Sequence, residues 1–422
     1  MNALSGDASL FAEVDGKYGV YTLRELFELY NQGRTIKVPT LLNEHGNIGW
    51  IEIKDVVNFG MQPLKRITLA TSRLFVEVSE DTIIPAFGHH LFEGNKEKIF
   101  LKFKHVNNLK ATQDPRCNNS LLLATRQPLN IPEGDQKEWN YGFALGYWVA
   151  EGWLVKRKRK NTELSLATLN GFAKKKGMTL EEYLEYMTDV QNVFLAIGQA
   201  DFERGYVDIL QKHFKFSKPY KNNGNGYLLY SSDLNYIHLI KEYTEGHTSH
   251  NKCVKNEVFN RSLKFLEGIL DGFLAGDGYF RKEQDLFKVK ITTNYRLYND
   301  LIFLSKALGY DVHLHNGYFA KSPSSNKLYY ELQLSIFKNW HRRTAFGLVK
   351  ERIKSIEDVG MKEAFNLVVK PLYPETDKRA IFNHLFFTAY EILVSDTMKT
   401  LEPLSAPLVE PECEIFSSLV NS

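Results

Sequence analysis

Two nine-residue segments decide the fold of this chain, ALGYWVAEG at 144–152 and LDGFLAGDG at 270–278. Each has glycine at its third position, a small residue at its seventh, a carboxylate at its eighth and glycine at its ninth. The third and seventh positions are four residues apart, so they lie on one face of a helix. Small side chains on such a face let two helix backbones approach closely. The pattern therefore predicts two helices that cross at their glycines.

A carboxylate closes each predicted helix, Glu151 in the first and Asp277 in the second. There it faces the negative end of the helix dipole, at a cost of ~0.3–1 kcal/mol. Crossing helices would add repulsion between the two charges, which a divalent cation bound between them would relieve. We expect Gly152 and Gly278, which follow, to end the helices in the left-handed conformation that glycine tolerates. The alternative is that each carboxylate is an ordinary surface acid near a helix end. This explains one such motif well, but it explains two matched copies poorly.

The composition is that of an ordinary globular protein. The 422 residues indicate two or three domains, and 43% hydrophobic with 24% charged residues exclude collagen-like, disordered and coiled-coil chains. No apolar stretch is long enough for a membrane helix, and the N-terminus lacks the features of a secretory signal. Three scattered cysteines argue against a disulfide framework or a structural zinc site. We therefore expect a cytoplasmic protein without a membrane partner.

The net charge is only +3, but basic residues gather in the middle of the chain. The clearest run comprises Lys156, Arg157, Lys158, Arg159 and Lys160, and a second comprises Lys174, Lys175 and Lys176. A positive segment between neutral or acidic ends is typical of a phosphate-binding insert. Solvated lysines on helix faces explain any single run about equally well.

The secondary-structure pattern changes twice along the chain. Short β-rich segments bounded by turns fill the first 120 residues, and β character returns after residue 353. Between them, helical periodicity runs through 141–154, 179–197, 234–243, 260–274 and 295–308. We therefore expect an all-β shell interrupted by an α/β insert with two related halves.

The two nine-residue motifs resemble those of single-chain LAGLIDADG homing endonucleases. The resemblance implies a monomer of two αββαββα-type halves related by a pseudo-twofold axis, bound to a long, specific double-stranded DNA site. It also implies that Glu151 and Asp277 are catalytic and bind Mg²⁺ (or Mn²⁺) at the scissile phosphates. This family often has a lysine beside the centre, and the candidates are Lys252, Lys255, Lys288 and Lys290. The expected DNA contacts are Lys156, Arg157, Lys158, Arg159, Lys160, Arg281, Lys288 and Lys290.

The β-rich ends of the chain resemble the Hint fold of inteins, the protein-splicing domains. The splicing positions implied by this resemblance are Ala3, Ser79, Thr82, Asn366, His384, Ser395, Asp396 and Thr397. Ala3 has no nucleophile for the acyl shift that normally starts splicing. Thr82 stands where the family has a histidine, and Asp396 lacks the amide nitrogen that asparagine cyclisation uses. These departures predict that splicing is impaired.

Together, the two resemblances predict a multidomain chain in which an all-β Hint-type splicing domain is interrupted by an α/β LAGLIDADG endonuclease domain. The expected boundaries are 3–125 and 345–396 for the splicing domain, 126–344 for the endonuclease, and 397–422 for a flank from the host extein protein. The leading hypothesis is a Mg²⁺-dependent, site-specific DNA endonuclease. One alternative is a self-processing intein whose endonuclease has decayed to DNA binding. Another is a nucleic-acid-binding module that keeps the fold but cuts nothing.

Overall fold

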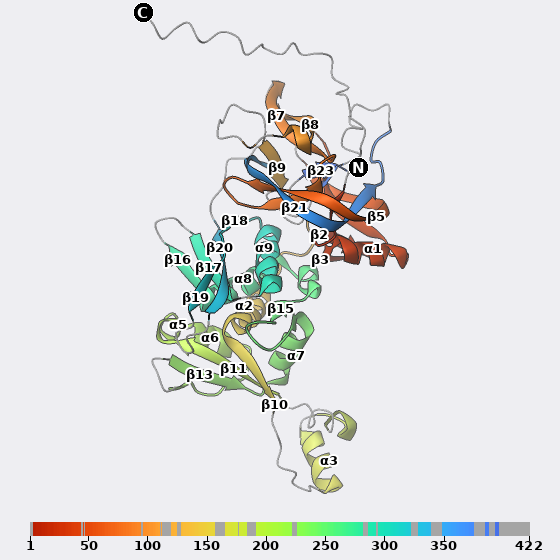
Figure 1. Ribbon diagram of the computed structural model, residues 1–422. Helices are drawn as coiled ribbons and strands as arrows, with labels where there is room; N and C mark the ends of the chain where they lie inside the picture. Colours follow the sequence, from red (N-terminus) through yellow and green to blue (C-terminus); the bar gives the residue numbers. More distant parts are fainter. Residues whose placement is uncertain are drawn as a thin grey trace, which may run out of the picture.

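The computed structural model describes most of the chain. The described residues are 3–43, 45, 47–93, 96–109, 111, 120–124, 128–156, 165–175, 177–183, 191–221, 226–281, 286–292, 294–321, 328–338, 348–374, 385–387 and 393–395. Within them, a β-rich part at one end of the molecule adjoins a part in which helices lie between two smaller sheets (Figure 1). No helix among the described residues is both long enough and apolar enough to cross a membrane.

The β-rich part contains a ten-stranded sheet with the order β3-β2-β4-β5-β6-β1-β21-β9-β7-β8. Its strands are β1 (Leu4–Ser5), β2 (Ser9–Val14), β3 (Lys17–Thr22), β4 (Ile36–Leu41), β5 (Ile48–Leu69), β6 (Phe75–Ser79), β7 (Ile83–Glu93), β8 (Lys96–His105), β9 (Ser120–Ala124) and β21 (Leu348–Val369). The long strands β5 and β21 pair antiparallel along most of their length, with several register shifts. Residues from both ends of the chain therefore share one sheet.

Smaller elements complete the β-rich part. Helix α1 (Leu23–Asn31) begins with a capping box between Thr22 and Glu25, and it buries Leu23 and Leu26 against the sheet. The 3₁₀ turn η1 (Val106–Asn108) follows β8, and the short strands β22 (Leu385–Phe387) and β23 (Leu393–Ser395) pair with each other.

The middle of the chain repeats one arrangement twice. Helix α2 (Gln136–Glu151) leads directly into a sheet of order β10-β11-β13-β12, and helix α8 (Leu263–Asp277) leads directly into one of order β16-β17-β20-β18, with β19 paired to β20. The strands are β10 (Gly152–Lys156), β11 (Gln191–Gly198), β12 (Tyr220–Lys221), β13 (Gly226–Ser231), β16 (Gly278–Arg281), β17 (Leu286–Thr292), β18 (Asp311–Leu314), β19 (Tyr318–Lys321) and β20 (Leu328–Phe337). The remaining elements are α3 (Leu166–Lys175), α5 (Gln199–Glu203), α6 (Tyr206–Gln211), α7 (Leu234–Tyr243), β14 (Thr244–Glu245), β15 (Cys253–Val254), η2 (Asn256–Asn260) and α9 (Tyr295–Ala307).

The predicted helices at 234–243 and 295–308 agree closely with α7 and α9. The helix predicted over 179–197 is wrong in its second half, because residues from Gln191 onward form strand β11. There Val193, Leu195 and Ile197 are all buried, which is the period of two of a half-buried strand. The residues before Val193 also include apolar side chains, so the sequence does not show where helical periodicity gives way to the period of a strand.

Two asparagines join the β-rich part to the helical part. The side-chain amide of Asn260 accepts a hydrogen bond from the backbone nitrogen of Tyr18 (2.8 Å) and donates one to its carbonyl oxygen (2.9 Å). Asn256 does the same with Val20, at 2.9 and 3.1 Å. Both partners lie on β3, an edge strand of the large sheet, so the amides occupy the place of a further strand. The contact anchors η2 to the sheet.

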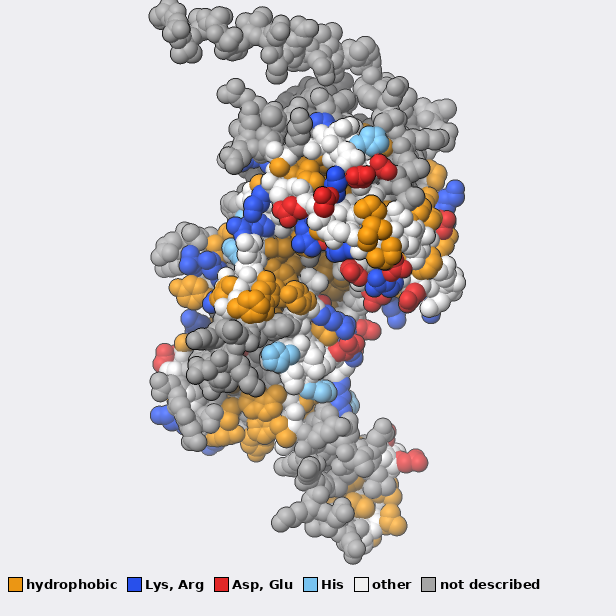
Figure 2. Space-filling view, in the orientation of Figure 1, with side chains coloured by type: hydrophobic (Ala, Val, Ile, Leu, Met, Phe, Trp, Pro, Cys, Tyr) orange, Lys and Arg blue, Asp and Glu red, His pale blue; other side chains and the backbone are white. Residues whose placement is uncertain are grey.

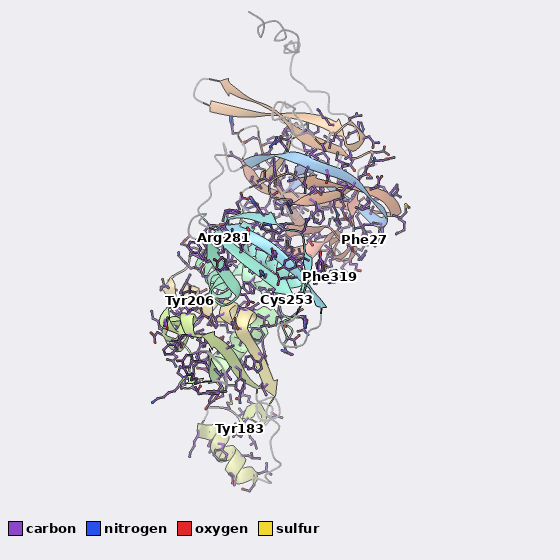
Figure 3. All side chains as sticks on the ribbon, turned by 60° about the vertical axis from the view of Figure 1, so that its left-hand side comes forward. Phe27, Tyr183, Tyr206, Cys253, Arg281 and Phe319 are labelled. Carbon is purple, nitrogen blue, oxygen red and sulfur yellow. The ribbon has the colours of Figure 1, made fainter. Side chains whose placement is uncertain are left out.

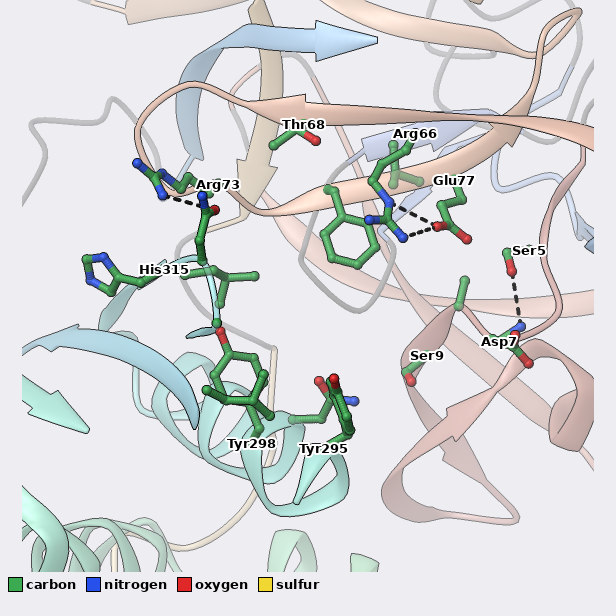
Figure 4. Close-up of a pocket in the computed structure, with 18 of the residues that line it drawn as sticks. Ser5, Asp7, Ser9, Arg66, Thr68, Arg73, Glu77, Tyr295, Tyr298 and His315 are labelled. Atoms are coloured by element: carbon green, nitrogen blue, oxygen red, sulfur yellow. Dashed lines mark hydrogen bonds and ion pairs between the residues drawn. The ribbon is translucent and has the colours of Figure 1, made fainter. Parts of the chain in front are cut away.

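A cleft of about 780 Å³ lies between the large sheet and α9 (Figure 4). Three of its charged side chains are paired within the wall: Glu77 is 2.6 Å from Arg66 and 2.7 Å from Lys362. Although burial opposes ionisation of Glu77, hydrogen bonds from Lys362 and Arg66 hold its pKa below the usual value. The charge of Glu77 is therefore compensated within the wall.

Candidate active site

Helices α2 and α8 pack with their backbones in direct contact, as the two motifs predict. The contact faces carry Gly142, Gly146 and Ala150 on α2, and Gly268, Gly272 and Gly276 on α8. A Cβ atom added to Gly146 would overlap the carbonyl oxygen of Ile269, and one added to Gly272 would overlap that of Phe143. The pairing is reciprocal, which is the pattern of two helices related by a pseudo-twofold axis. Gly142 and Gly268 extend it one turn beyond the motifs that the sequence revealed.

The glycines that follow the two helices differ from expectation. Gly152 has φ −98° and Gly278 has φ −88°, so neither adopts the predicted left-handed conformation. Each begins a strand directly, β10 or β16. A Cβ atom would overlap the indole of Trp148 at the first position and the carbonyl oxygen of Leu274 at the second. Glycine is therefore needed here for space, not for backbone conformation.

Glu151 and Asp277, at the last positions of α2 and α8, lie close enough to influence each other. A Cβ atom on Gly276 would be 2.9 Å from Cγ of Glu151, so the Glu151 side chain crosses the end of α8. Burial, followed by the charge of Asp277, raises the pKa of Glu151 to about 7. Desolvation by the surrounding groups raises the pKa of Asp277 to about 6, although part of this residue is exposed to solvent. The helix crossing thus brings together the two carboxylates that the motifs singled out.

Lys252 lies beside this pair and is 2% exposed. Its Nζ donates hydrogen bonds to the carbonyl oxygens of Trp148 (3.1 Å), Ala150 (3.4 Å) and Gly152 (3.0 Å). A cation there offsets the negative end of the α2 dipole, where Glu151 is unfavourable. Burial lowers the pKa of Lys252 to about 8, although both carboxylates oppose this change. Cys253, the next residue, lies near the centre of the helical part (Figure 3).

The other three candidate lysines have different surroundings. Lys255 donates to the carbonyl oxygen of Lys241 (2.7 Å). Lys290, on the exposed face of β17, lies 3.2 Å from Glu331, and Lys288 shares its strand face. Among the described lysines, Lys252 is the one whose charge acts on both carboxylates. No local sequence motif identifies Lys252, because it lies on a loop outside both nine-residue motifs.

A third acid, which the sequence did not single out, lies next to the pair. Asp201, on α5, accepts a hydrogen bond from the hydroxyl of Tyr147 (3.4 Å), and its charge contributes to the raised pKa of Glu151. Burial raises the pKa of Asp201 as well. Tyr147 is the fourth residue of the first motif, so the motif itself orients this acid.

The donor set suits a hard divalent cation. Within the described residues there is no group of three or more His, Cys, Asp or Glu side chains placed to hold a metal ion. Glu151 and Asp277 offer carboxylate oxygens, the ligands that Mg²⁺ prefers, and this ion usually keeps several waters. Their raised pKa values mean that positive charge between them would be favourable. The residues present therefore fit a cation that is completed by water and substrate oxygens.

The predicted DNA contacts are only partly described. The side chain of Lys156 and residues 157–160 lie outside the described residues. Arg281 is exposed at the end of β16 (Figure 3). Lys288 and Lys290 lie on the face of β17 that points away from the helices, while Val289 on the opposite face is buried. The second sheet therefore presents three of the predicted basic residues to solvent.

Three predicted splicing positions meet in the β-rich part. The backbone nitrogen of Ala3 donates to the hydroxyls of Ser79 and Thr82, both at 3.3 Å, and the carbonyl oxygen of Ala3 accepts from the backbone nitrogen of Ser79 (2.8 Å). Ala3 is fully buried, and Asn366 on β21 is 8% exposed. His384, Asp396 and Thr397 lie outside the described residues, and only the backbone of Ser395 is described.

Comparison with known proteins yields structural similarities alone. No protein-family model and no curated protein matches the chain. Similar solved structures include I-DmoI in complex with DNA and Mn (12% identity, TM-score 0.30, covering 48% of this chain and 98% of that chain). An Ssp DnaB mini-intein variant matches at 8% identity and TM-score 0.29 (94% and 99%), and an intein from a hyperthermophile at 20% and 0.24 (29% and 73%).

The similar structures include inteins and LAGLIDADG proteins. They are the two families whose motifs this sequence resembles. At these identities and TM-scores, the similarity assigns no activity to the chain. The functional argument therefore rests on the geometry around Glu151 and Asp277.

Proposed function

We propose that this chain is a site-specific endonuclease that hydrolyses phosphodiester bonds in double-stranded DNA with the help of Mg²⁺ or Mn²⁺. The supporting observation is that Glu151, which is half-buried, and Asp277 meet at a glycine-lined helix crossing. Two acids in such surroundings repel each other and oppose two helix dipoles. A folded protein retains an arrangement of this kind mainly where function needs it.

Each residue of the site has a distinct role in the proposed reaction. Glu151 and Asp277 would hold the cation at the seam between the two halves. The bound ion would supply a water of lowered pKa and charge neutralisation at the leaving oxygen. Lys252 fixes the C-terminal turn of α2 through three backbone hydrogen bonds, and its positive charge limits the repulsion between the carboxylates. The charge of Asp201, which accepts a hydrogen bond from Tyr147, acts on Glu151.

The position of the two small sheets supports a duplex substrate. Edge strand β10 begins at the residue after Glu151, and edge strand β16 begins at the residue after Asp277. The two sheets therefore extend from opposite sides of the carboxylate pair, and a long DNA site would cross both. One chain supplies both halves, so we propose that the enzyme acts as a monomer with pseudo-twofold symmetry.

We also propose that the endonuclease, residues 126–344, interrupts a Hint-type splicing domain formed by 3–125 and 345–396, with 397–422 as an extein flank. The pairing of β21 with β1, β5 and β9 supports this division. Ala3 lacks a nucleophile, so we propose that splicing is impaired.

The test is cleavage of a pool of random-sequence duplexes by the purified full chain with Mg²⁺, followed by sequencing of the cut ends. We expect Glu151→Gln and Asp277→Asn to abolish cleavage but to retain DNA binding. The matched control is Glu267→Gln, which changes a carboxylate of α8 that pairs with Lys264 near the surface, 2.7 Å away. Unchanged cleavage by both site variants, or no metal-dependent cleavage by the parent, would refute the proposal.

A second candidate function is self-processing by the β-rich part. The observation that favours it is that the hydroxyl oxygens of Ser79 and Thr82 both accept hydrogen bonds from the backbone nitrogen of Ala3. Hydroxyls that bind an amide nitrogen in this way could polarise the peptide bond before Ala3. Incubation of the purified chain at neutral pH without DNA, followed by mass spectrometry, separates the candidates. We expect an intact chain, whereas cleaved or ligated products would favour self-processing.

A further inference from the structure

The solvent-facing side of the first small sheet carries a row of aromatic rings. The strand register places Trp153 of β10, Phe194 of β11 and Tyr230 of β13 side by side. The ring centroids of Trp153 and Phe194 are 5.6 Å apart, and those of Phe194 and Tyr230 are 6.1 Å apart. Val193, Leu195 and Leu229 occupy the opposite face and are fully buried. The row therefore points away from the helices.

Apolar residues continue on both sides of this row. Val155 is 39% exposed, and Leu228 is half-buried beside Tyr220, which is 44% exposed. Among the described side chains of these strands, this face carries no charge. Hydrophobic side chains are visible over β11 and β13 in Figure 2. Asn192 pairs with Val155 and shares this face, whose other described strand positions are aromatic, aliphatic or glycine. An exposed apolar face of this kind marks a contact surface.

The corresponding face of the second sheet is mixed and, unlike the first, carries charged side chains. Its outward positions include Arg281, Lys288, Lys290, Gln333 and Ser335, together with Tyr279 and Glu331. The side chains of Lys290 and Gln333 both donate to the hydroxyl of Tyr318 at 3.0 Å. This face therefore offers hydrogen-bond donors, two of them held by Tyr318, and the carboxylate of Glu331 lies beside Lys290.

The two faces are equivalent in position, because β10 and β16 start at the two carboxylates. In the proposed complex, each face would lie in the major groove of one half of the target. Thymine presents an apolar C5-methyl group there, whereas guanine presents two acceptors that suit arginine and lysine. The apolar face of the first sheet therefore suits thymine, and the basic residues of the second sheet suit guanine.

We infer that the two halves recognise chemically different half-sites: the aromatic face selects thymine-rich sequence through its methyl groups, and the polar face selects guanine. This inference rests on the proposed function. It gives the target a direction that the pseudo-twofold backbone alone would not provide. Phe194 and Lys288 are the residues that we expect to determine specificity in their respective halves.

The test begins with selection of bound sites from randomised duplex DNA by the full chain carrying Glu151→Gln. We expect one half of the selected site to contain consecutive thymines on one strand and the other half to contain guanines. Phe194→Ala should relax the preference only in the first half, and the matched control Lys288→Ala only in the second. Circular dichroism and thermal melting confirm that each variant is folded.

Deoxyuridine provides the sharper measurement, because it removes the thymine methyl and leaves base pairing unchanged. We expect each contacted methyl that is removed from the thymine-rich half to weaken binding about fourfold, from ~0.8 kcal/mol per buried methyl and ~1.4 kcal/mol per tenfold change. Deoxyuridine in the other half should have no effect. In that half, 7-deazaguanine, which lacks one acceptor, should weaken binding.

The outcomes separate this inference from the proposed function. Site-specific binding that deoxyuridine leaves unchanged in both halves overturns the inference and leaves the endonuclease proposal intact. Failure to select any sequence, together with no cleavage by the parent, refutes both. A parent chain that dimerises in sedimentation, with Phe194→Ala as a monomer, assigns the aromatic face to self-association and also overturns the inference.

Discussion

Replacement of Gly146 by alanine should force apart the helices that hold the carboxylates together. A Cβ atom at this position would overlap the carbonyl oxygen of Ile269 and lie 2.9 Å from the backbone nitrogen of Phe273. Both are backbone atoms of α8, so no side-chain rotation can relieve the contact. The only relief is separation of α2 from α8.

Two effects of opposite sign determine how much Gly146→Ala changes the free energy of unfolding. Alanine is a better helix former than glycine by ~0.5–1 kcal/mol. Overpacking of a close-packed interior costs ~1–3 kcal/mol, and more when backbones must move. Because the clash involves backbone alone, we take the upper part of that range and expect a net loss of about 2 kcal/mol. For a domain of roughly 200 residues this corresponds to a fall of about 4–8 °C in Tm.

The matched control is Gly171→Ala in α3, where an added Cβ would meet nothing within 4 Å. The same chemical change should there stabilise the protein by ~0.5–1 kcal/mol. Denaturant titration followed by circular dichroism measures both variants, and DNA cleavage measures the separation of the carboxylates, which we expect to lower the rate more than tenfold. The reasoning fails if both substitutions shift stability in the same direction.

Three further predictions concern the site and its support. Lys252→Met should cost about 3 kcal/mol of unfolding free energy, because three backbone oxygens lose their donor, whereas Lys255→Met should cost less than ~1 kcal/mol in the same denaturant titration. In metal-free buffer Glu151→Gln should melt above the parent at pH 8, with a smaller difference at pH 5. The folded pKa of Glu151, about 7, exceeds its unfolded value of ~4.3, so the folded carboxyl binds its proton more tightly. The parent therefore loses stability as the pH rises between these two values. A difference in Tm that does not depend on pH would contradict this reasoning. Asn260→Ala should leave the backbone of Tyr18 without the side-chain partners that Asn260 provides. We expect it to lower the free energy of unfolding by ~1–3 kcal/mol and to accelerate hydrogen exchange at the Tyr18 amide. Unchanged exchange would refute the role of this contact.

Local sequence patterns predicted the helices α2, α7, α8 and α9, but they missed helices α3, α5 and α6 and strand β11. The spacing of small residues predicted the crossing of α2 and α8, because steric access along a helix face depends only on residues four apart. Strand β11 was missed, because a short apolar segment fits both periodicities until its partners are known. Its neighbours β10 and β13 supply the hydrogen bonds that decide between them.

The sequence by itself determined that two carboxylates end two glycine-faced helices, since that statement needs nothing beyond residue identity and spacing. Tertiary structure alone decided that Lys252 joins them, that the charge of Asp201 acts on Glu151, and that the amides of η2 pair with β3. These contacts connect residues that are 25 or more positions apart in the chain. No local pattern encodes such pairs, because their distance depends on the packing of every element between them.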